Sequence, residues 1–162
     1  MKKLFFKEKL FKITDHYPIL DEGGREEYFV DQDFTFIGYK SKVSDKSGRE
    51  IFNIDRKIVS FLPHYHINFA DGNQMTIKKN LSFFKKSIDV QSENEVLRLN
   101  GDIFSYNFKI TNGAGKPIGG VQRTIFALTD TFELDIYDLD YEYQLIALVI
   151  CLNNILDLEQ AS

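Results

Sequence analysis

Tryptophan is absent from the chain, and cysteine occurs once and proline three times among its 162 residues. The single cysteine, Cys151, cannot close an internal disulfide, so a reducing compartment is expected. No Pro/Ser-rich linker and no low-complexity block divides the chain, which predicts a single domain over residues 1–162. The net charge of −4 gives no general case for nucleic-acid binding.

A long apolar leader is also missing at the N-terminus. The first residues, MKKLFF, resemble the beginning of a signal peptide, but Lys7, Glu8 and Lys9 then interrupt any apolar core. We therefore expect no export and a cytoplasmic location, with peripheral contact to a membrane left open.

Aromatic residues are abundant, with 15 Phe and 8 Tyr, and they lie in segments that alternate apolar and polar positions. Each segment ends where Asp or Asn stands near Gly, the residues that tolerate tight turns. Turns are predicted at 21–24, 45–48, 70–73, 99–102 and 111–117. The part of the chain before residue 138 is therefore expected to be almost entirely antiparallel strands.

An internal repeat links two of these regions. Residues 39–67 lie over 106–134 without a gap when the sequence is shifted by 67 positions. Tyr39 then meets Tyr106, and the turn glycines and apolar positions stay in phase. This agreement predicts a duplicated meander of strands.

Eight consecutive apolar residues, Leu145 to Leu152, stand close to the C-terminus. Glu142 and Asn153 bound the run, which leaves it shorter than the roughly 20 residues that a membrane span needs. We predict a helix over about 141–157 that is apolar on every side and is enclosed by protein.

The duplicated meander offers an enclosure. Two curved sheets leave open edges unless they close on one another, and a closed barrel of about twelve strands is too wide for strand side chains alone to fill. The sequence therefore predicts a mainly β fold, a closed antiparallel barrel of about twelve strands around the hydrophobic C-terminal helix.

The segment DKSGREIFNIDRKIVSFLPHYHI (45–67), its repeat and the terminal helix resemble the LURP-one-related family. That family belongs to the tubby C-terminal-like superfamily, with phospholipid scramblases as distant kin. The resemblance runs from about Leu4 to Leu156 and implies a twelve-stranded barrel threaded by a helix. Tubby domains bind phosphoinositides through a basic surface, so the resemblance also implies lipid binding, although no lipid-contacting motif aligns with particular residues here.

Two motifs that suggest ligands have simpler explanations. The Gly-rich stretch 112–120 lacks the spacing of a phosphate loop and predicts a hairpin turn. His64 and His66 share a strand face, but His16, the remaining histidine, is distant in sequence, so no metal site is predicted.

The acidic segment 130–142 lacks the spacing of a calcium-binding loop. We expect a solvated strand face followed by a helix cap, with Glu133 and Asp135 pointing to opposite faces.

Two arginines occupy the same place in the two repeats. Arg56 and Arg123 each share a strand face with apolar neighbours. An arginine there should pair with a carboxylate at the barrel rim or emerge from an apolar outer face. A structural role through pairing is favoured, because buried arginine is retained when it has a partner.

Lysines next to aromatic residues form the candidate ligand-binding surface. Anionic lipid head groups attract such lysines, while natural sheets also use lysine to protect their edges. The candidate lipid contacts are Lys57, Lys78, Lys79, Lys85 and Lys86.

No nucleophile, base and orienting group can be assembled from the sequence, so we predict neither an enzyme nor a cofactor. The first functional hypothesis is a barrel that binds anionic phospholipid, or another amphiphile, at its basic surface. The alternative is a protein-interaction scaffold that docks a partner on a strand edge or an aromatic patch.

Overall fold

The computed structural model spans residues 1–162 and describes all of them except 9–14, 35–37, 60–61, 82–85, 125–130 and 161–162. A 3₁₀ turn, η1 (Leu139–Tyr141), leads into the long C-terminal helix α2 (Glu142–Gln160). The described strands are β1 (Lys2–Lys7), β2 (His16–Leu20), β3 (Glu26–Phe34), β4 (Tyr39–Asp45), β5 (Glu50–Val59), β6 (Leu62–Phe69), β7 (Gln74–Leu81), β8 (Lys86–Ser92), β9 (Glu95–Asp102), β10 (Asn107–Thr111), β11 (Pro117–Arg123) and β12 (Thr131–Ile136).

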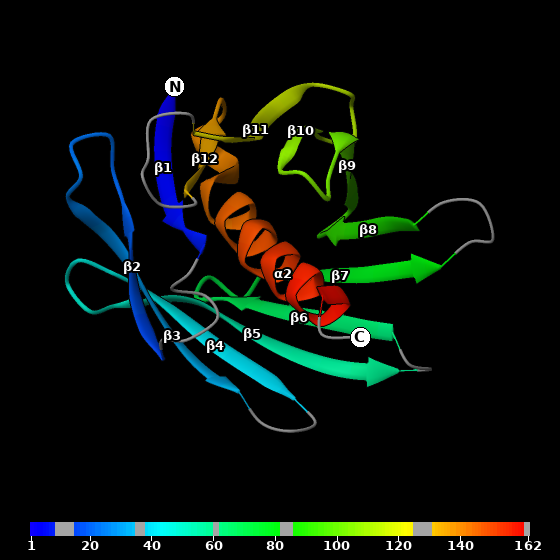
Figure 1. Ribbon diagram of the computed structural model, residues 1–162, viewed down its shortest axis with the longest axis horizontal. Coiled ribbons are helices and arrows are strands. Elements are labelled where there is room, and N and C mark those ends of the chain that lie inside the picture. Colours follow the sequence, from blue (N-terminus) through cyan, green and yellow to red (C-terminus); the bar gives the residue numbers. More distant parts are fainter. Residues whose placement is uncertain (9–14, 35–37, 60–61, 82–85, 125–130, 161–162) are drawn as a thin grey trace.

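The twelve strands close into one barrel (Figure 1). Each strand pairs antiparallel with the strands before and after it in the chain, and β1 closes the barrel by pairing with β12. This seam joins successive residue pairs from Lys2–Ile136 to Lys7–Thr131. Every described strand therefore has two neighbours, and the predicted closed barrel is confirmed.

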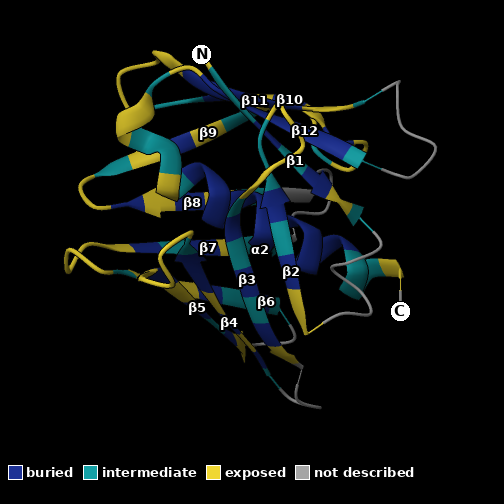
Figure 2. Cartoon of the chain, turned by 90° about the vertical axis from the view of Figure 1, so that its left-hand side faces the viewer, coloured by how far each residue is buried: buried dark blue, intermediate teal, exposed yellow. Residues whose placement is uncertain are grey.

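Helix α2 fills the barrel and is surrounded by strands in both views (Figures 1 and 2). Its residues from Leu145 to Leu156 are all buried, including two asparagines. Because strands lie on all sides, the helix needs no polar stripe, which explains why its sequence has none. The observed helix begins one residue after the predicted start and ends three residues after the predicted end.

A glycine allows the helix to approach the wall at β11. A Cβ atom on Gly119 would lie 2.9 Å from Leu145 Cδ1 and 2.8 Å from the carbonyl oxygen of Asp135. A larger residue at this position would clash with the β12 backbone and would require the Leu145 side chain of the helix to move.

Four of the five predicted turns form as expected, each with a glycine at positive φ: Gly24, Gly48, Gly72 and Gly115. The turn predicted at 99–102 is wrong, because β9 continues to Asp102. Gly101 lies within that strand at φ 132°, where a Cβ would meet the carbonyl oxygen of Asn107 at 2.6 Å. The glycine there serves close strand packing.

The pairing registers of the two repeat units coincide. Val43 pairs with Phe52, and the residues 67 positions later, Ile110 and Gly119, pair as well. The β4–β5 and β10–β11 ladders each shift register at the following residue. The β5–β6 register is likewise the β11–β12 register moved by 67 residues. This agreement supports the proposed duplication.

Candidate functional site

Two asparagines inside the barrel anchor the helix to the wall. Tyr106 Oη donates to Asn153 Oδ1 at 2.7 Å. Asn154 Oδ1 accepts from Tyr65 Oη at 2.6 Å and from Arg56 Nη1 at 2.9 Å. These bonds satisfy polar atoms that would otherwise be costly in an apolar interior.

Each of the two arginines of the repeat lies over the equivalent tyrosine ring. The Arg56 guanidinium carbon lies 5.9 Å from the ring centre of Tyr39, and that of Arg123 lies 5.0 Å from the ring centre of Tyr106. Arg123 also forms the expected ion pair with a carboxylate, Glu8, at 3.1 Å. Arg56 is buried and donates to an amide oxygen of the helix, a partner that the sequence reasoning did not foresee.

Two of the five predicted lipid-binding lysines lie in one row on the outside of the barrel. His64 of β6 pairs with Lys57 of β5 on one side and with Lys78 of β7 on the other. Both lysines are exposed. Burial lowers the pKa of His64, and the charges of Lys78 and His66 lower it further. We call these three residues the basic row.

Of the other three lysines, Lys79 is the one whose side chain the structure describes, and it lies outside this row. Lys79 forms an ion pair with Glu159 at the C-terminal end of the helix, and both side chains are largely buried. Lys85 lies outside the described residues, and Lys86 begins β8 but its side chain is not described. Their role in binding stays a prediction.

The histidines do not assemble a metal site among the described residues, in which no group of three potential ligands forms. His64 has two lysines as its cross-strand neighbours, and their charge opposes a bound cation. His16 lies on another strand, where its Nδ1 is 2.6 Å from Asp31 Oδ1.

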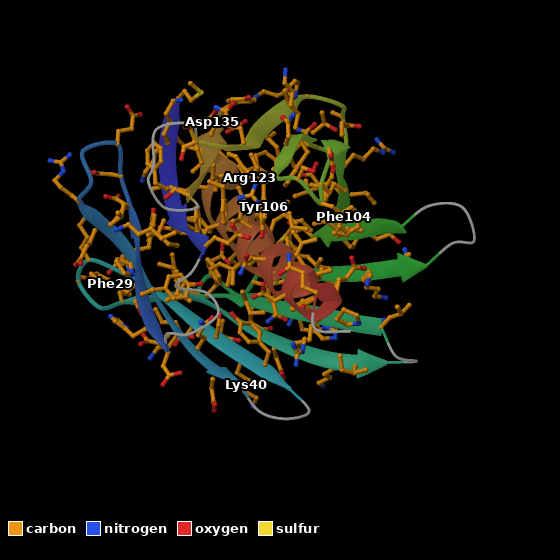
Figure 3. The ribbon with its side chains drawn as sticks, in the orientation of Figure 1. Phe29, Lys40, Phe104, Tyr106, Arg123 and Asp135 are labelled. Carbon is orange, nitrogen blue, oxygen red and sulfur yellow. The ribbon has the colours of Figure 1, made fainter. Side chains whose placement is uncertain are left out.

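A polar cluster that the sequence reasoning missed lies on the outside of β1, β11 and β12. Lys3 Nζ contacts Glu133 Oε1 at 2.5 Å and Asp135 Oδ1 at 3.4 Å. Gln122 Nε2 donates to Glu133 Oε1 at 3.1 Å. In Figure 3, the label of Asp135 lies in the upper part of the barrel, near β1 and β12 of Figure 1. We call Lys3, Gln122, Glu133 and Asp135 the carboxyl cluster.

The expectations for Glu133 and Asp135 were wrong in two respects. Residues two apart on a strand point to the same face, so the two carboxyls lie together. Each residue is only 8% exposed, which differs from a solvated strand face. The alternation Phe132, Glu133, Leu134, Asp135 was the available signal, because it puts two acids on one side and core residues on the other.

Their shared surroundings separate the two pKa values. Burial and a hydrogen bond with Glu133 raise the pKa of Asp135 to about 6. Burial acts against ionisation of Glu133 as well, but hydrogen bonds with Asp135, Lys3 and Gln122 lower its pKa. The pair therefore holds a proton that is released in the mildly acidic range.

Two grooves meet at the carboxyl cluster. The larger, of about 510 Å³, has Phe5 and Leu20 among its lining, together with Arg123 and Glu133. The smaller, of about 360 Å³, is lined by Asn107, Lys109, Gly120, Gln122, Asp135 and Tyr137, among others. Both lie on the outer surface, because the helix fills the inside of the barrel.

These features define a closed twelve-stranded antiparallel barrel around a hydrophobic helix, the tubby C-terminal-like architecture. A family model described as LURP-one-related matches residues 2–153, and the chain belongs to the LURP-one-related family. Within the described residues, no helix is both long and apolar enough to cross a membrane.

Two known proteins are similar over most of the chain. The uncharacterized protein YxjI of Bacillus subtilis (strain 168) is 26% identical over 136 residues, which cover 84% of this chain and 82% of that protein. An X-ray structure of a protein from Arabidopsis thaliana superposes with a TM-score of 0.67 at 13% identity, covering 95% of this chain and 90% of the other. At that identity the likeness concerns the fold.

The helix anchors lead to a stability prediction. Replacing Asn154 by Leu keeps a side chain of similar size but removes the acceptor of two buried donors, the Tyr65 hydroxyl and the charged guanidinium of Arg56. Replacing Asn153 by Leu removes the acceptor of one buried donor, the Tyr106 hydroxyl. An unsatisfied buried donor costs about 1–3 kcal/mol, and more when it is charged. Urea unfolding should show the larger loss for Asn154→Leu, and equal losses would contradict the anchoring role.

The carboxyl cluster leads to a prediction on pH. The pKa of Asp135 is about 6 in the folded protein, above the value of about 3.9 for an unfolded chain. The folded state then binds the proton more tightly, so the free energy of unfolding should fall as pH rises from about 4 to 6.

The variant Asp135→Asn should lack this fall, and the wild type should lose about 1–3 kcal/mol relative to the variant over that range. Urea unfolding at closely spaced pH values measures the difference. Parallel pH profiles for the two proteins would show that Asp135 ionises normally.

Proposed function

We propose that this barrel is a binding module that attaches to anionic phospholipid surfaces through the basic row. The observation that carries the proposal is the register that sets Lys57, His64 and Lys78 side by side on neighbouring strands. Family membership supports the domain type, and the resemblance to tubby domains supports a lipid as the ligand.

The filled interior determines how such binding would occur. The residues of α2 from Leu145 to Leu152 are fully buried, so within the described part of the chain the helix occupies the interior that an acyl chain would need. Attachment is therefore electrostatic and superficial, with each lysine contributing about 1 kcal/mol at an anionic surface. Asp89 pairs with Lys78 across β7 and β8 and reduces the positive potential at one end of the row. The binding should be weak and sensitive to salt.

Co-sedimentation with vesicles tests the proposal. Wild-type protein should pellet with vesicles containing phosphatidylserine at low salt, pellet less at high salt, and stay in solution with phosphatidylcholine alone. The double variant Lys57→Glu/Lys78→Glu should lose most of this binding, because it reverses both charges of the row.

The control variant replaces two other lysines of the same barrel by glutamate. Lys40 and Lys42 of β4 are exposed and lie opposite Asp33 and Asp31, respectively, on β3. The variant Lys40→Glu/Lys42→Glu changes the net charge equally, so it should bind nearly as well as wild type. Equal losses in both double variants would mean that net charge alone governs binding, and no binding by the wild type would end the lipid proposal.

A second candidate function is the protein-interaction scaffold, supported by the barrel end where α2 begins. Leu139 is 62% exposed and Tyr143 38% exposed. Two grooves of about 360 and 270 Å³ adjoin there and share Phe69, Asp71 and Tyr143 in their lining. Exposed tyrosine beside a groove is a typical anchor for a protein partner. The strand edge offered as an alternative is not available, since every described strand is paired on both sides.

The scaffold function predicts a salt-resistant complex that depends on this end of the barrel. Affinity purification should recover a defined partner in high salt with the wild type, and the variant Leu139→Ser/Tyr143→Ser should release it. A partner retained by that variant would place the interaction elsewhere.

A further inference from the structure

The groove of about 360 Å³ beside the carboxyl cluster, lined by Gly120 and Asp135, is built around a missing side chain. On the outer face, Lys109 of β10 pairs with Gly120 of β11, and Gly120 pairs with Asp135 of β12. Neighbouring strands lie about 4.8 Å apart, so the backbones of the lysine and the aspartate are about 10 Å apart. Because the residue between them is glycine, a slot opens between a cationic and an anionic side chain.

The other half of the barrel shows the same place filled. The residues 67 positions earlier are Lys42, Asn53 and Asn68, which pair across β4, β5 and β6 in the same way. Asn68 Nδ2 donates to Asn53 Oδ1 at 3.2 Å, so two amides occupy the space. Glycine in place of the first asparagine and aspartate in place of the second open the slot in β10–β12 and add a negative charge.

Both charges that flank the slot retain binding capacity. Within the described part of the chain, the ammonium of Lys109 has no hydrogen-bond or ion-pair partner. Asp135 and Gln122 both line the groove, and Asp135 Oδ2, on the side of β11, has one long contact there, from Gln122 Nε2 at 3.5 Å. A carboxylate oxygen can accept more than one hydrogen bond, so Oδ2 can take a further N–H donor from the groove.

An aromatic ring and an amide complete the lining. The hydroxyl of Tyr137 lies 3.1 Å from the point that a Cβ on Gly120 would occupy, so this side chain reaches over the slot. A tyrosine ring attracts a nearby cation. Asn107 also lines the groove and offers an amide N–H to an anion near Lys109.

We propose that this slot binds a small zwitterion, with its primary ammonium against Asp135 and Tyr137 and its anionic group against Lys109 and Asn107. The groove of about 360 Å³ has the size of a small-molecule site. A primary ammonium can donate a hydrogen bond to the Asp135 carboxylate, which a trimethylated ammonium cannot do. Free amino-acid-like molecules and the head group of phosphatidylethanolamine share this chemistry.

Titration of the carboxyl cluster supports the same ligand. The groups facing Asp135 are Lys3 from β1, Gln122 from β11 and Glu133 on its own strand, and Lys109 lies across the slot. Burial and Glu133 raise the pKa of Asp135 to about 6. An incoming ammonium would replace the proton held there, so binding should weaken as the pH falls below 6.

Amide-resolved NMR titration of the full chain with O-phosphoethanolamine tests the proposal. The amides of β10–β12 around Gly120 should shift, with a Kd on the order of 1 mM or tighter for so small a ligand. Ethanolamine and inorganic phosphate, each carrying one of the two charges, should bind at least tenfold more weakly. No shift, or equal affinity for either half, would overturn the proposal.

Three variants locate the site. Gly120→Val fills the slot with a residue that strands accept, and it should abolish the shifts. Lys109→Gln removes an exposed charge without disturbing the core, and it should weaken binding at least tenfold, which keeps the test valid if the valine variant does not fold. The matched control is Lys42→Gln, the equivalent lysine of the first repeat, which should bind as wild type does. Binding that survives Lys109→Gln, or that is lost equally in Lys42→Gln, would overturn the proposal.

Vesicles without anionic lipid distinguish the two sources of the ligand. Phosphatidylethanolamine vesicles that pellet the wild type but not Lys109→Gln would identify the lipid head group. Binding of the soluble probe without pelleting would identify a free zwitterion. Pelleting that does not require Lys109 would count against the slot. The basic row plays no part here, since these vesicles carry no net charge for it to bind.

Discussion

The constraint on which this structure depends is the burial of a helix that is apolar on every side. Such a helix cannot face water, and it requires a wall that surrounds it completely. A twelve-stranded closed barrel supplies that wall and removes sheet edges at the same time. Neither part is stable without the other, because an empty barrel of this width would lack a core. The repeated strand registers suggest that two similar half-walls meet around one helix.

Apolar packing alone would allow the helix to rotate or slide along its axis inside the barrel. Hydrogen bonds and ion pairs near both ends of the helix prevent this. At the N-terminal end, Glu142 accepts from the Tyr28 hydroxyl at 2.6 Å and pairs with Lys2. Toward the other end, Asn153 and Asn154 receive donors from opposite halves of the barrel. Because a buried donor without a partner is costly, these few bonds select one position of the helix.

The strands of the barrel and the helix inside it could be predicted from the sequence, because both depend on local patterns of residues. Alternation marks the strands, Asp/Asn–Gly pairs mark most turns, and an uninterrupted apolar run marks the helix. The partners of Arg56 could not be foreseen, since Asn154 is 98 residues away and meets it only in the closed barrel. The slot at Gly120 could not be foreseen either. A lone glycine in a strand has several uses, and which one applies depends on the side chains of the neighbouring strands.

A filled interior also decides where function can reside. Ligands must bind outside, where strand pairing arranges side chains in lateral rows that the core does not constrain. The two halves share the same strand registers, so outward-facing side chains at equivalent positions can differ between them without disturbing the fold. The basic row on β5–β7 and the glycine slot on β10–β12 are separated by strands β8 and β9 in the closed order of the barrel. A duplicated barrel can thus hold its inner positions for stability while each outer face acquires a chemistry of its own.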